Sequence, residues 1–366
     1  MTRRRFAREA GAALLTAMLT VTLVATFAAA ALWQQWRSAE IEAAERARAQ
    51  AGLVLIGALD WSRLILREDA RASGASGGAD HLAEPWAVPL EEAKLTTFLT
   101  AEKNIASDAL EGLPEAYLSG RIIDAQSKLN VLNLVNAGKP VAASVATFTK
   151  LFQLLNLPAG DVALLTQNLQ QALPANASVP DPANTPAGAA SAAAGSPTGT
   201  AGNANANTGR SAAPDSGAAP AGVPLVPQRT TQLVWLGLSP ATVAALEPYV
   251  TVLPVRTPLN LNTASAEAIF ASLPSLDLAG AKRLVESRGR SYFKTVADAN
   301  LLIPQSSDKF ATEQHSVSTR FFEVQARLRI DKTWVEEQTL LQRDNLDVRM
   351  VWRERGAGAT PTAAKP

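Results

Sequence analysis

The chain begins with two hydrophobic patterns in succession. A basic leader ends at Gly11, and residues 12 to 33 contain no charged side chain. After them, apolar residues recur near helical spacing between arginines and glutamates. No Pro or Gly interrupts residues 12 to 51, which favours one unbroken helix. The pattern predicts a helix from Ala12 to about Ala70, roughly 90 Å long at the standard rise per residue.

The second half of this helix is amphipathic. We expect Trp61, Leu64 and Ile65 to pack it against a sheet. The apolar positions of this half are Ala43, Ala44, Ala47, Ala51, Val54, Leu55, Ala58, Leu59, Leu64 and Ile65.

The first half is long enough to cross a membrane, since about 20 apolar helical residues span a ~30 Å hydrocarbon core. Its flanks differ in charge. Arginines precede it and glutamates follow it: Arg3, Arg4, Arg5 and Arg8 on one side, Glu40, Glu42 and Glu45 on the other. Because a Lys/Arg excess holds a flank in the cytoplasm, this asymmetry predicts a cytoplasmic N-terminus with most of the chain outside the cytoplasm.

Three interpretations of this segment predict different mature N-termini. The segment is a plain anchor, a removable secretory signal or a prepilin-type leader. Residues 28 to 31 supply an A-x-A-like cleavage site, and the run from Arg3 to Phe6 is like a twin-arginine signal. The predicted helix runs unbroken through that site, which disfavours cleavage there. A prepilin leader accounts for more of the pattern: arginines, Gly11 at the membrane boundary, an apolar span and an amphipathic extension.

Breaks and short elements follow the helix. Residues 73 to 79 are rich in Gly and Ser, and Pro85 and Pro89 keep the next stretch extended or looped. Residues 118 to 135 hold two apolar runs around residues 124 to 127, which predicts a hairpin or a sharp strand bend. We expect Trp86 to anchor the loop after the helix.

A helical stretch comes next, from about 141 to 173 with a break at 157 to 160. Residues 174 to 228 turn to Ala, Pro, Gly, Ser, Asn and Thr with few charges. This composition cannot bury enough apolar surface to offset chain entropy, so it predicts a disordered insertion. Helical signals resume at Ser239, an N-cap residue followed by Pro240, and continue to Pro304.

The last third of the folded part has a strand pattern. Apolar and polar residues alternate over residues 321 to 330, and again at Leu346, Val348, Met350 and Trp352. Asp331-Lys332 and Asp344-Asn345 are turn candidates. The pattern predicts an antiparallel meander with one buried face, followed by an unstructured tail after Gly356.

The strand signals near 119 to 134 and 317 to 354 bracket a mostly helical block. A stable sheet needs three or more strands, so we expect both groups in one sheet with the block inserted between them. The predicted fold class is α+β: a pilin-like long N-terminal transmembrane helix packed on an antiparallel sheet, with an inserted mostly α-helical domain.

Composition favours a protein that binds other proteins. The 34 Lys and Arg residues balance 33 Asp and Glu, which leaves no overall field to attract nucleic acid. The sequence has no Cys, which excludes disulfides, thiolate metal sites and a Cys nucleophile. Its two histidines, His81 and His315, are interpreted as loop or surface residues.

In combination, several segments resemble one family, the type II secretion minor pseudopilin K (general secretion pathway protein K). The resemblance covers nearly the whole folded chain except the insertion and the tail. It rests on Gly11 followed by AALL, GALDWSRLILRED (57 to 69), EPWAVPL (84 to 90), LSGRIIDAQSKLNVLNLV (118 to 135), LNLNTASAEAI (259 to 269), RFFEVQARLRI and WRERG.

This resemblance implies a non-enzymatic role. Members are cleaved by a prepilin peptidase after the leader glycine, here between Gly11 and Ala12, and the new N-terminus is methylated. They join a periplasmic pseudopilus that helps move folded proteins through the outer membrane. The K component resembles a cap at its tip, in complex with minor pseudopilins I and J. The implied location is the bacterial inner membrane, single-pass, with a cytoplasmic N-terminus and a periplasmic C-terminal domain.

The resemblance also implies a division of the chain. Residues 1–11 are the prepilin leader, and residues 12–33 and 34–72 are the transmembrane and periplasmic parts of the first helix. Residues 73–140 and 305–355 form the pilin-like sheet region. Residues 141–304 form the inserted helical domain, including the disordered segment 174–228, and residues 356–366 form a disordered tail.

Thr16 occupies the fifth position counted from Ala12, where most pilin-like subunits carry Glu. That carboxylate pairs with the terminal amine of a neighbouring subunit. A charge in hydrocarbon is costly unless it is paired, so a subunit with no neighbour above it is expected to lack the carboxylate. Thr16 therefore fits a tip position; otherwise it is one of several tolerated threonines of the span.

An alternative function comes from residues 259 to 303, which also resemble a helix-hairpin-helix DNA-binding module of the competence type. Such modules bind phosphates through backbone N–H groups of a Gly-rich hairpin. Here the Gly-hydrophobic-Gly turn is missing and Asp277 sits where phosphate would approach. We therefore interpret Lys282, Arg283, Arg288, Arg290 and Lys294 as a solvated helix face and expect no nucleic-acid partner.

Two common enzymatic motifs, the P-loop and His-Glu-x-x-His, are absent from the sequence. We expect no required cofactor. The family resemblance allows Ca²⁺, and loops holding Asp298 or Asp308 are conceivable ligands, but no ligand is assigned. Asn130, Asn133, Asn260 and Asn262 are interpreted as turn and cap residues.

Overall fold

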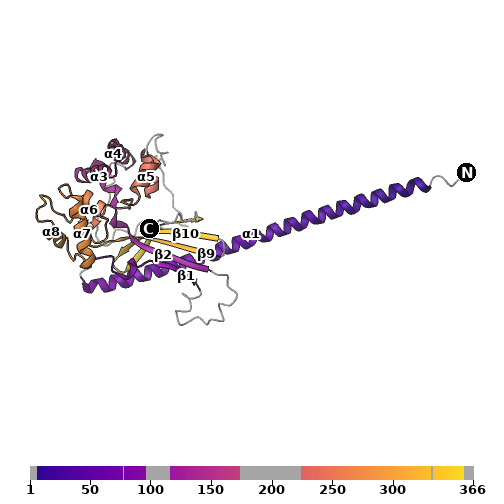
Figure 1. Ribbon diagram of the computed structural model, residues 1–366, viewed down its shortest axis with the longest axis horizontal. Coiled ribbons are helices and arrows are strands. Elements are labelled where there is room, and N and C mark those ends of the chain that lie inside the picture. Colours follow the sequence, from indigo (N-terminus) through magenta and orange to yellow (C-terminus); the bar gives the residue numbers. More distant parts are fainter. Residues whose placement is uncertain (1–5, 77, 96–115, 174–223, 331–332, 358–366) are drawn as a thin grey trace, which may run out of the picture.

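One helix dominates the shape of the molecule. In the computed structural model, which describes residues 6–76, 78–95, 116–173, 224–330 and 333–357, helix α1 (Phe6–Ser76) is 71 residues long. Its first half projects alone from a globular head, and its second half lies along a sheet of that head (Figure 1). The predicted unbroken helix is confirmed, and it starts before Ala12 and ends after Ala70.

The head contains a five-stranded sheet and a group of short helices. The strands are β1 (Leu90–Lys94), β2 (Ala116–Asp124), β3 (Leu129–Asn130), β4 (Val135–Asn136), β5 (Lys139–Pro140), β6 (Val250–Thr251), β7 (Leu259–Asn260), β8 (His315–Ser316), β9 (Phe321–Ile330), β10 (Thr333–Asp344) and β11 (Asp347–Ala357). The α-helices after α1 are α3 (Ala142–Leu154), α4 (Gly160–Ala172), α5 (Pro240–Leu246), α6 (Ala266–Ser272), α7 (Leu278–Arg290) and α8 (Val296–Leu301). The 3₁₀ helices are η1 (Pro85–Ala87), η3 (Ala125–Ser127), η4 (Val131–Leu134) and η7 (Thr230–Leu236).

The large sheet joins distant parts of the sequence. Its order is β1-β2-β9-β10-β11, and every pairing is antiparallel. Strand β2 pairs with β9, with Asp124 opposite Phe322, although the helical residues lie between them in sequence. The remaining strands form two-stranded pairs: β3 with β6, β4 with β5 and β7 with β8. The predicted α+β class, with a long helix on an antiparallel sheet and further helices, is confirmed.

Helix α1 packs on the inner face of the sheet through two apolar clusters. Leu55 lies with Leu328 and Ile330, whereas Leu59 and Leu66 lie with Trp86 and Phe322. Trp86 is 1% exposed and meets the Phe322 ring edge-on, which confirms its predicted anchoring role.

One predicted contact of α1 is wrong: Leu64 is 49% exposed, because the buried positions follow Leu55, Leu59, Ser62 and Leu66 around the helix. Trp61 is 39% exposed but borders a cavity together with residues of β2 and β9. Ile65 is partly buried against the sheet, as predicted.

The short helices share one core, separate from the two clusters under α1. It includes Phe148 and Phe152 of α3, Leu165 of α4, Ile269 of α6 and Leu284 of α7. The break predicted near 157 to 160 separates α3 from α4. The predicted Ser239 cap is confirmed, since its side chain accepts a hydrogen bond from the Thr242 N–H. Residues 129–135 also pack into this core.

The turns and the edge strand differ in part from the predictions. After β2 the chain bends into η3 and leaves the sheet, so residues 118 to 135 form the bend rather than the hairpin. Leu346 lies in the turn between β10 and β11, next to Asn345 at φ +54°. Met350, predicted to share a buried face with Val348, is 47% exposed; β11 is the edge strand, and its pairing with β10 shifts register between Met350 and Trp352.

Several predictions fall on residues outside the described ranges. The turn at Asp331-Lys332, most of the predicted insertion at 174–228 and the tail after residue 357 belong to this group. Residues 224–228 and Gly356 are described, and β11 continues through Gly356 to Ala357.

Candidate assembly helix and buried polar junction

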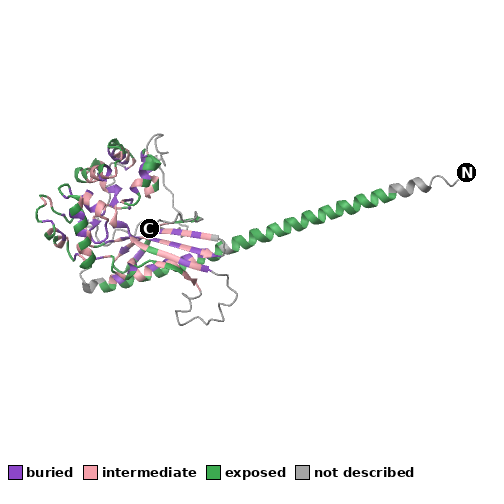
Figure 2. Cartoon of the chain, in the orientation of Figure 1, coloured by how far each residue is buried: buried purple, intermediate pink, exposed green. Residues whose placement is uncertain are grey.

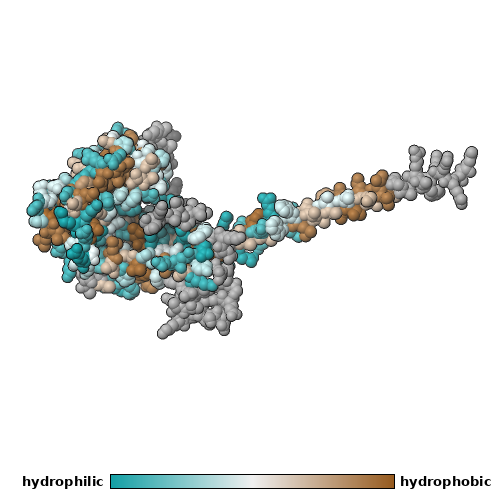
Figure 3. Space-filling view, viewed as in Figure 1, coloured by the Kyte–Doolittle hydropathy of each residue, from teal (hydrophilic) through white to brown (hydrophobic). Residues whose placement is uncertain are grey.

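The first half of α1 presents an apolar surface with no cover from the head. From residue 13 to residue 50 no described side chain is buried, and Leu14 and Phe27 are 67% and 69% exposed (Figure 2). Apolar residues gather along the part of the helix farthest from the head (Figure 3). Within the described chain, Ala13–Ala72 is the one helix long and apolar enough to cross a membrane.

Thr16 lies in this exposed segment, and its hydroxyl is satisfied within the helix. The hydroxyl donates to the Ala13 carbonyl at 2.9 Å, and Thr20, Thr22 and Thr26 make the same kind of bond. A threonine bonded in this way carries no unpaired donor into an apolar environment. Gly11 and Ala12 lie within α1, five and six residues after its start.

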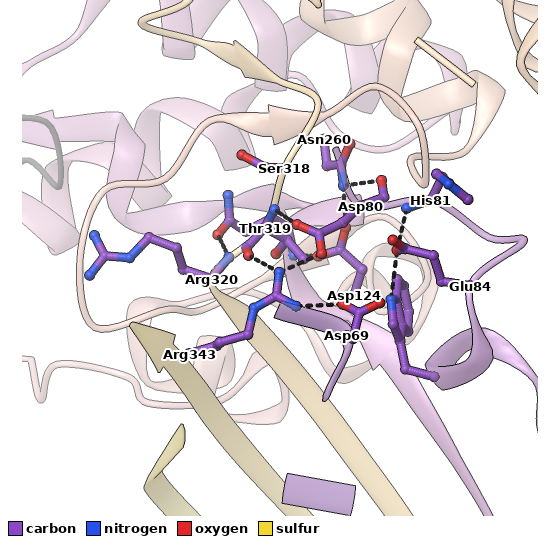
Figure 4. Close-up of polar contacts among 12 residues, drawn as sticks. Asp69, Asp80, His81, Glu84, Asp124, Asn260, Ser318, Thr319, Arg320 and Arg343 are labelled. Atoms are coloured by element: carbon purple, nitrogen blue, oxygen red, sulfur yellow. Dashed lines mark hydrogen bonds and ion pairs between the residues drawn. The ribbon is translucent and has the colours of Figure 1, made fainter. Parts of the chain in front are cut away.

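Where α1 ends, a buried polar junction ties it to the sheet. Arg343 of β10 donates through Nη1 to Asp69 of α1 at 2.7 Å and through Nη2 to Asp80 (Figure 4). The other carboxylate oxygen of Asp80 accepts from the Thr319 N–H at 2.7 Å. Arg343, Asp69 and Asp80 are at most 8% exposed. A buried arginine between two carboxylates has its charge and its directed N–H groups satisfied together.

The junction continues into the helical part of the head through Asp124, the last residue of β2. Asp124 accepts from the Asn260 side chain at 2.8 Å and from the Thr263 hydroxyl at 2.5 Å. Asn260 also donates to the Asp80 carbonyl at 3.3 Å. The end of α1, the sheet and the helical part are therefore joined by one set of hydrogen bonds, which Figure 4 shows converging on Asp80.

Carboxylates outnumber cations at this junction, and the pKa values of three of these carboxyl groups are raised. Burial raises the pKa of Asp80 to about 6, although the Arg343 charge and the Thr319 N–H act in the opposite direction. Burial also raises the pKa of Glu84 to about 7 and raises that of Asp124. Glu84 accepts from the His81 N–H and the Trp86 indole at 2.9 and 2.8 Å. Protonation of Asp80 and Glu84 is therefore within the reach of mildly acidic conditions.

Asp69, Asp80 and Glu84 have carboxylate oxygens within 4.8 Å of one another. They do not fit a calcium site, because Arg343 already bonds two of the three carboxylates, and a guanidinium there repels a cation. The two acids named from the sequence are also engaged: Asp298 caps α8 with Thr295, and Asp308 accepts from the Ser275 N–H. We assign no calcium ligand.

A second polar contact docks α1 nearer its middle. Glu337 of β10 is 3% exposed and accepts from Arg353 at 2.6 Å and from Arg355 at 3.0 Å. Arg355 also reaches the Gly52 carbonyl of α1, at 3.5 Å. A Cβ at Gly52 would lie 2.8 Å from Arg355, so the absent side chain admits the guanidinium.

The hairpin between α6 and α7 does not have the geometry of a phosphate site. Asp277 caps α7 by accepting from the Gly280 N–H at 2.8 Å, which places a carboxylate where a phosphate would bind. Arg288 donates to the Leu261 carbonyl, and burial lowers its pKa to about 10. Arg288 is thus an internal contact, whereas Lys282, Arg283, Arg290 and Lys294 are exposed.

The four asparagines named from the sequence are structural residues. Asn130 and Asn133 bind the loop around Thr257, Asn262 binds both backbone groups of Phe293, and Asn260 belongs to the junction. Sequence reasoning missed Asp69, Asp80, Glu337 and Arg343. One signal was available in the strand alternation of β10: Glu337 and Arg343 lie on the same face of the strand as the apolar residues Val335 and Leu341.

Comparisons with known proteins agree on one family. Two family models, both described as type II secretion system (T2SS), protein K, match residues 127–255 and 259–318, which together make up just over half of the chain. A type II secretion system protein K from Pseudomonas aeruginosa is 28% identical over 354 residues, covering 96% of this chain and 94% of the relative.

A solved structure has the same fold. It is a chain from the GspK-GspI-GspJ complex of the enterotoxigenic Escherichia coli type 2 secretion system, with a TM-score of 0.56 and 17% identity. The match covers 86% of this chain and 99% of that one. The fold, the two family matches and the full-length relative lead to one conclusion: the chain belongs to the type II secretion system protein K family.

Proposed function

We propose that this protein is a minor pseudopilin of the type II secretion system that supports the export of folded proteins. The division of α1 carries the proposal: an uncovered apolar half continues without a break into a half docked on the head. This arrangement suits a subunit whose helix leaves the membrane and joins a bundle of similar helices. The family is a structural one, and we propose no catalytic role and no required cofactor.

We further propose a single-pass inner-membrane location with the head in the periplasm. The arginines before the span and the glutamates after it support a cytoplasmic N-terminus. A prepilin peptidase then cuts between Gly11 and Ala12, and the new amine is methylated. The domain division given above, from the leader at 1–11 to the tail at 356–366, is part of the same proposal.

The proposed position is the tip of the pseudopilus, in contact with minor pseudopilins I and J and through them with the other pseudopilins. The solved complex with this fold contains GspI and GspJ, and we extend that partnership to this chain. Thr16 supports the tip position, because it leaves no carboxylate to pair with a subunit above.

Mass spectrometry of the N-terminus of the membrane-extracted protein tests the processing step. We expect a methylated Ala12. Gly11→Val should retain the leader, whereas Gly57→Val, the same change at an open position of the same helix, should be processed normally. A start after Ala31 would indicate an exported soluble protein, and a retained Met1 in the unaltered chain would indicate a simple anchor.

Deletion of the gene tests the role. Secretion of the exported proteins should stop and pseudopilus assembly should be altered, and both should return with the wild-type gene. Unchanged secretion in the deletion strain would contradict the proposed function.

A further inference from the structure

A cavity lies in the helical part of the head, and none of its described lining residues belongs to α1 or to the polar junction. Its volume is about 260 Å³, and it is bounded by α3, α6 and the segments around residues 128 to 133, 256 to 259 and 313 to 315. Ser144 and Phe148 line it from α3, and Ser272 lines it from α6. The described lining residues come from two parts of the sequence, residues 128 to 148 and residues 256 to 315.

Arg256 lines this cavity, and no described residue is a partner of its guanidinium. Its Nε atom is buried and makes no hydrogen bond, and within the described chain the guanidinium has no ion pair or hydrogen bond at all. A buried donor without a partner costs free energy, and a charged one costs more. By contrast, Lys128 at the same cavity donates to the Glu247 carbonyl at 2.9 Å, and Arg343 elsewhere binds two carboxylates.

The electrostatic balance of the cavity favours an anion. Its charged lining residues are Lys128 and Arg256 against Glu313, which is exposed. His315 contributes no charge at neutral pH, because burial lowers its pKa to about 4, and its Nε2 lies 3.0 Å from the Ser272 hydroxyl. The first turn of α3, which carries Ser144, has no side-chain cap and no acidic residue, so no described side chain of that turn offsets the positive end of the helix dipole.

Apolar groups narrow the class of ligand. Phe148, Leu129 and Leu259 line the cavity beside the cations. Inorganic anions have no apolar body to place against these side chains, whereas an organic acid has one. The cavity volume lies at the lower limit of the volumes usual for small-molecule sites, so the ligand must be small. We propose that this cavity binds a carboxylate group attached to a short aliphatic chain, with Arg256 as its main partner.

Binding to the full-length protein in detergent micelles tests the proposal. Isothermal titration with glutarate should show saturable binding, and glutaramide, its uncharged isostere, should not bind. Arg256→Met keeps the aliphatic stem and should weaken glutarate binding at least tenfold. Arg290→Met removes one exposed arginine of the same head and should change the affinity less than twofold. The peptide acetyl-Gly-Glu-Gly-amide tests which kind of molecule supplies the carboxylate. If the peptide binds about as tightly as glutarate, the ligand is a protein side chain inserted into the cavity. If only glutarate binds, the ligand is a free organic acid.

Thermal unfolding gives a second readout. Because Arg256 has no partner to lose among the described residues, Arg256→Met should keep or raise the melting temperature of the ligand-free protein. Absence of binding by both carboxylate probes, equal binding of glutaramide, or unchanged affinity in Arg256→Met would overturn the proposal. So would a clear fall of the melting temperature in Arg256→Met, since it would show that the guanidinium stabilises the fold.

Discussion

Burial and charge oppose each other at Asp80. Its carboxylate is 1% exposed, faces Arg343 on one side and lies near Asp69, Glu84 and Asp124. One arginine does not offset the desolvation of this group, so its pKa stands at about 6 instead of 3.8. The folded state therefore keeps the Asp80 proton at pH values where the unfolded chain has released it.

The predicted consequence is a loss of stability as pH rises from about 4 to 6. In this window the native state binds more protons than the unfolded state, so the free energy of unfolding falls with pH, by on the order of 2 kcal/mol for a shift of this size. Asp80→Asn removes the Asp80 part of this dependence, whereas Glu84 and Asp124, whose pKa values are also raised, keep a dependence of the same sign. The measurement is urea unfolding of the full chain in micelles at several pH values.

The difference between wild type and Asp80→Asn reports Asp80 together with its effect on Glu84, whose pKa the Asp80 charge raises. His315, whose pKa is about 4, opposes the trend in wild type, because it favours folding as pH rises towards 6.5, but it is the same in both proteins. Glu91→Gln, an exposed carboxylate of β1, is the control and should leave the slope unchanged. Parallel curves for wild type and Asp80→Asn would contradict the prediction.

Thr16 allows a test of the proposed tip position at the scale of one side chain. Thr16→Glu places a carboxylate in the apolar span, where an unpaired charge costs about 3 kcal/mol. If no subunit lies above this one, the charge finds no amine, and membrane insertion and secretion should fall. Thr16→Val should behave like wild type, because the lost hydroxyl bonds only its own helix at Ala13. Secretion and membrane fractionation are the measurements; full activity of Thr16→Glu would argue for a neighbour above.

At the scale of elements, the docking of α1 depends on one helical face. Leu55 is fully buried under β9, whereas Leu53, two residues earlier, is 70% exposed. Leu55→Ala should destabilise the head by about 2–5 kcal/mol, because it leaves a cavity between helix and sheet. Leu53→Ala should stay within about 0.5 kcal/mol of wild type. Urea midpoints in micelles compare the two, and similar losses for both would show that the assigned face is wrong.

The elements that local pattern determines were predictable. The alternation over β9, the Ser239 cap of α5 and the unbroken α1 each follow from neighbouring residues, and each is present in the structure. The phase of α1 against the sheet was predicted only in part. Trp61 and Leu64 are as apolar as Leu55, and only the position of the sheet decides which of them is buried.

The polar junction could not be predicted, because its members are separated along the chain. Asp69 and Arg343 are 274 residues apart, and nothing in the neighbourhood of either indicates the other. Their burial also runs against the preference of single charges for the surface, so pattern reasoning places both outside the core. A charged residue at a position on the apolar face of a strand, such as Arg343, indicates that a buried partner exists but does not identify that partner.

At the scale of the whole molecule, contacts at the two ends of the head distinguish a tip subunit from a subunit within the pseudopilus shaft. Leu53 is exposed on α1 near the point where the helix leaves the head, and Leu301 ends α8, on the side of the head away from the N-terminus (Figure 1). A tip subunit contacts other pseudopilins along its helix and leaves its far end free. A subunit within the shaft contacts neighbours at both ends.

Site-specific crosslinking separates these arrangements, and the absence of cysteine makes each introduced thiol unique in the chain. Leu53→Cys and Leu301→Cys are both highly exposed, at 70% and 77%, so a photoreactive maleimide should label them equally. Illumination of intact cells with an assembled pseudopilus should then yield adducts with other pseudopilins from position 53 and none from position 301. Leu55→Cys is the control for nonspecific labelling: position 55 is buried, so the maleimide should not react there. Pseudopilin adducts from position 301 would place a subunit beyond the head and remove the tip assignment, while leaving membership of the pseudopilus intact.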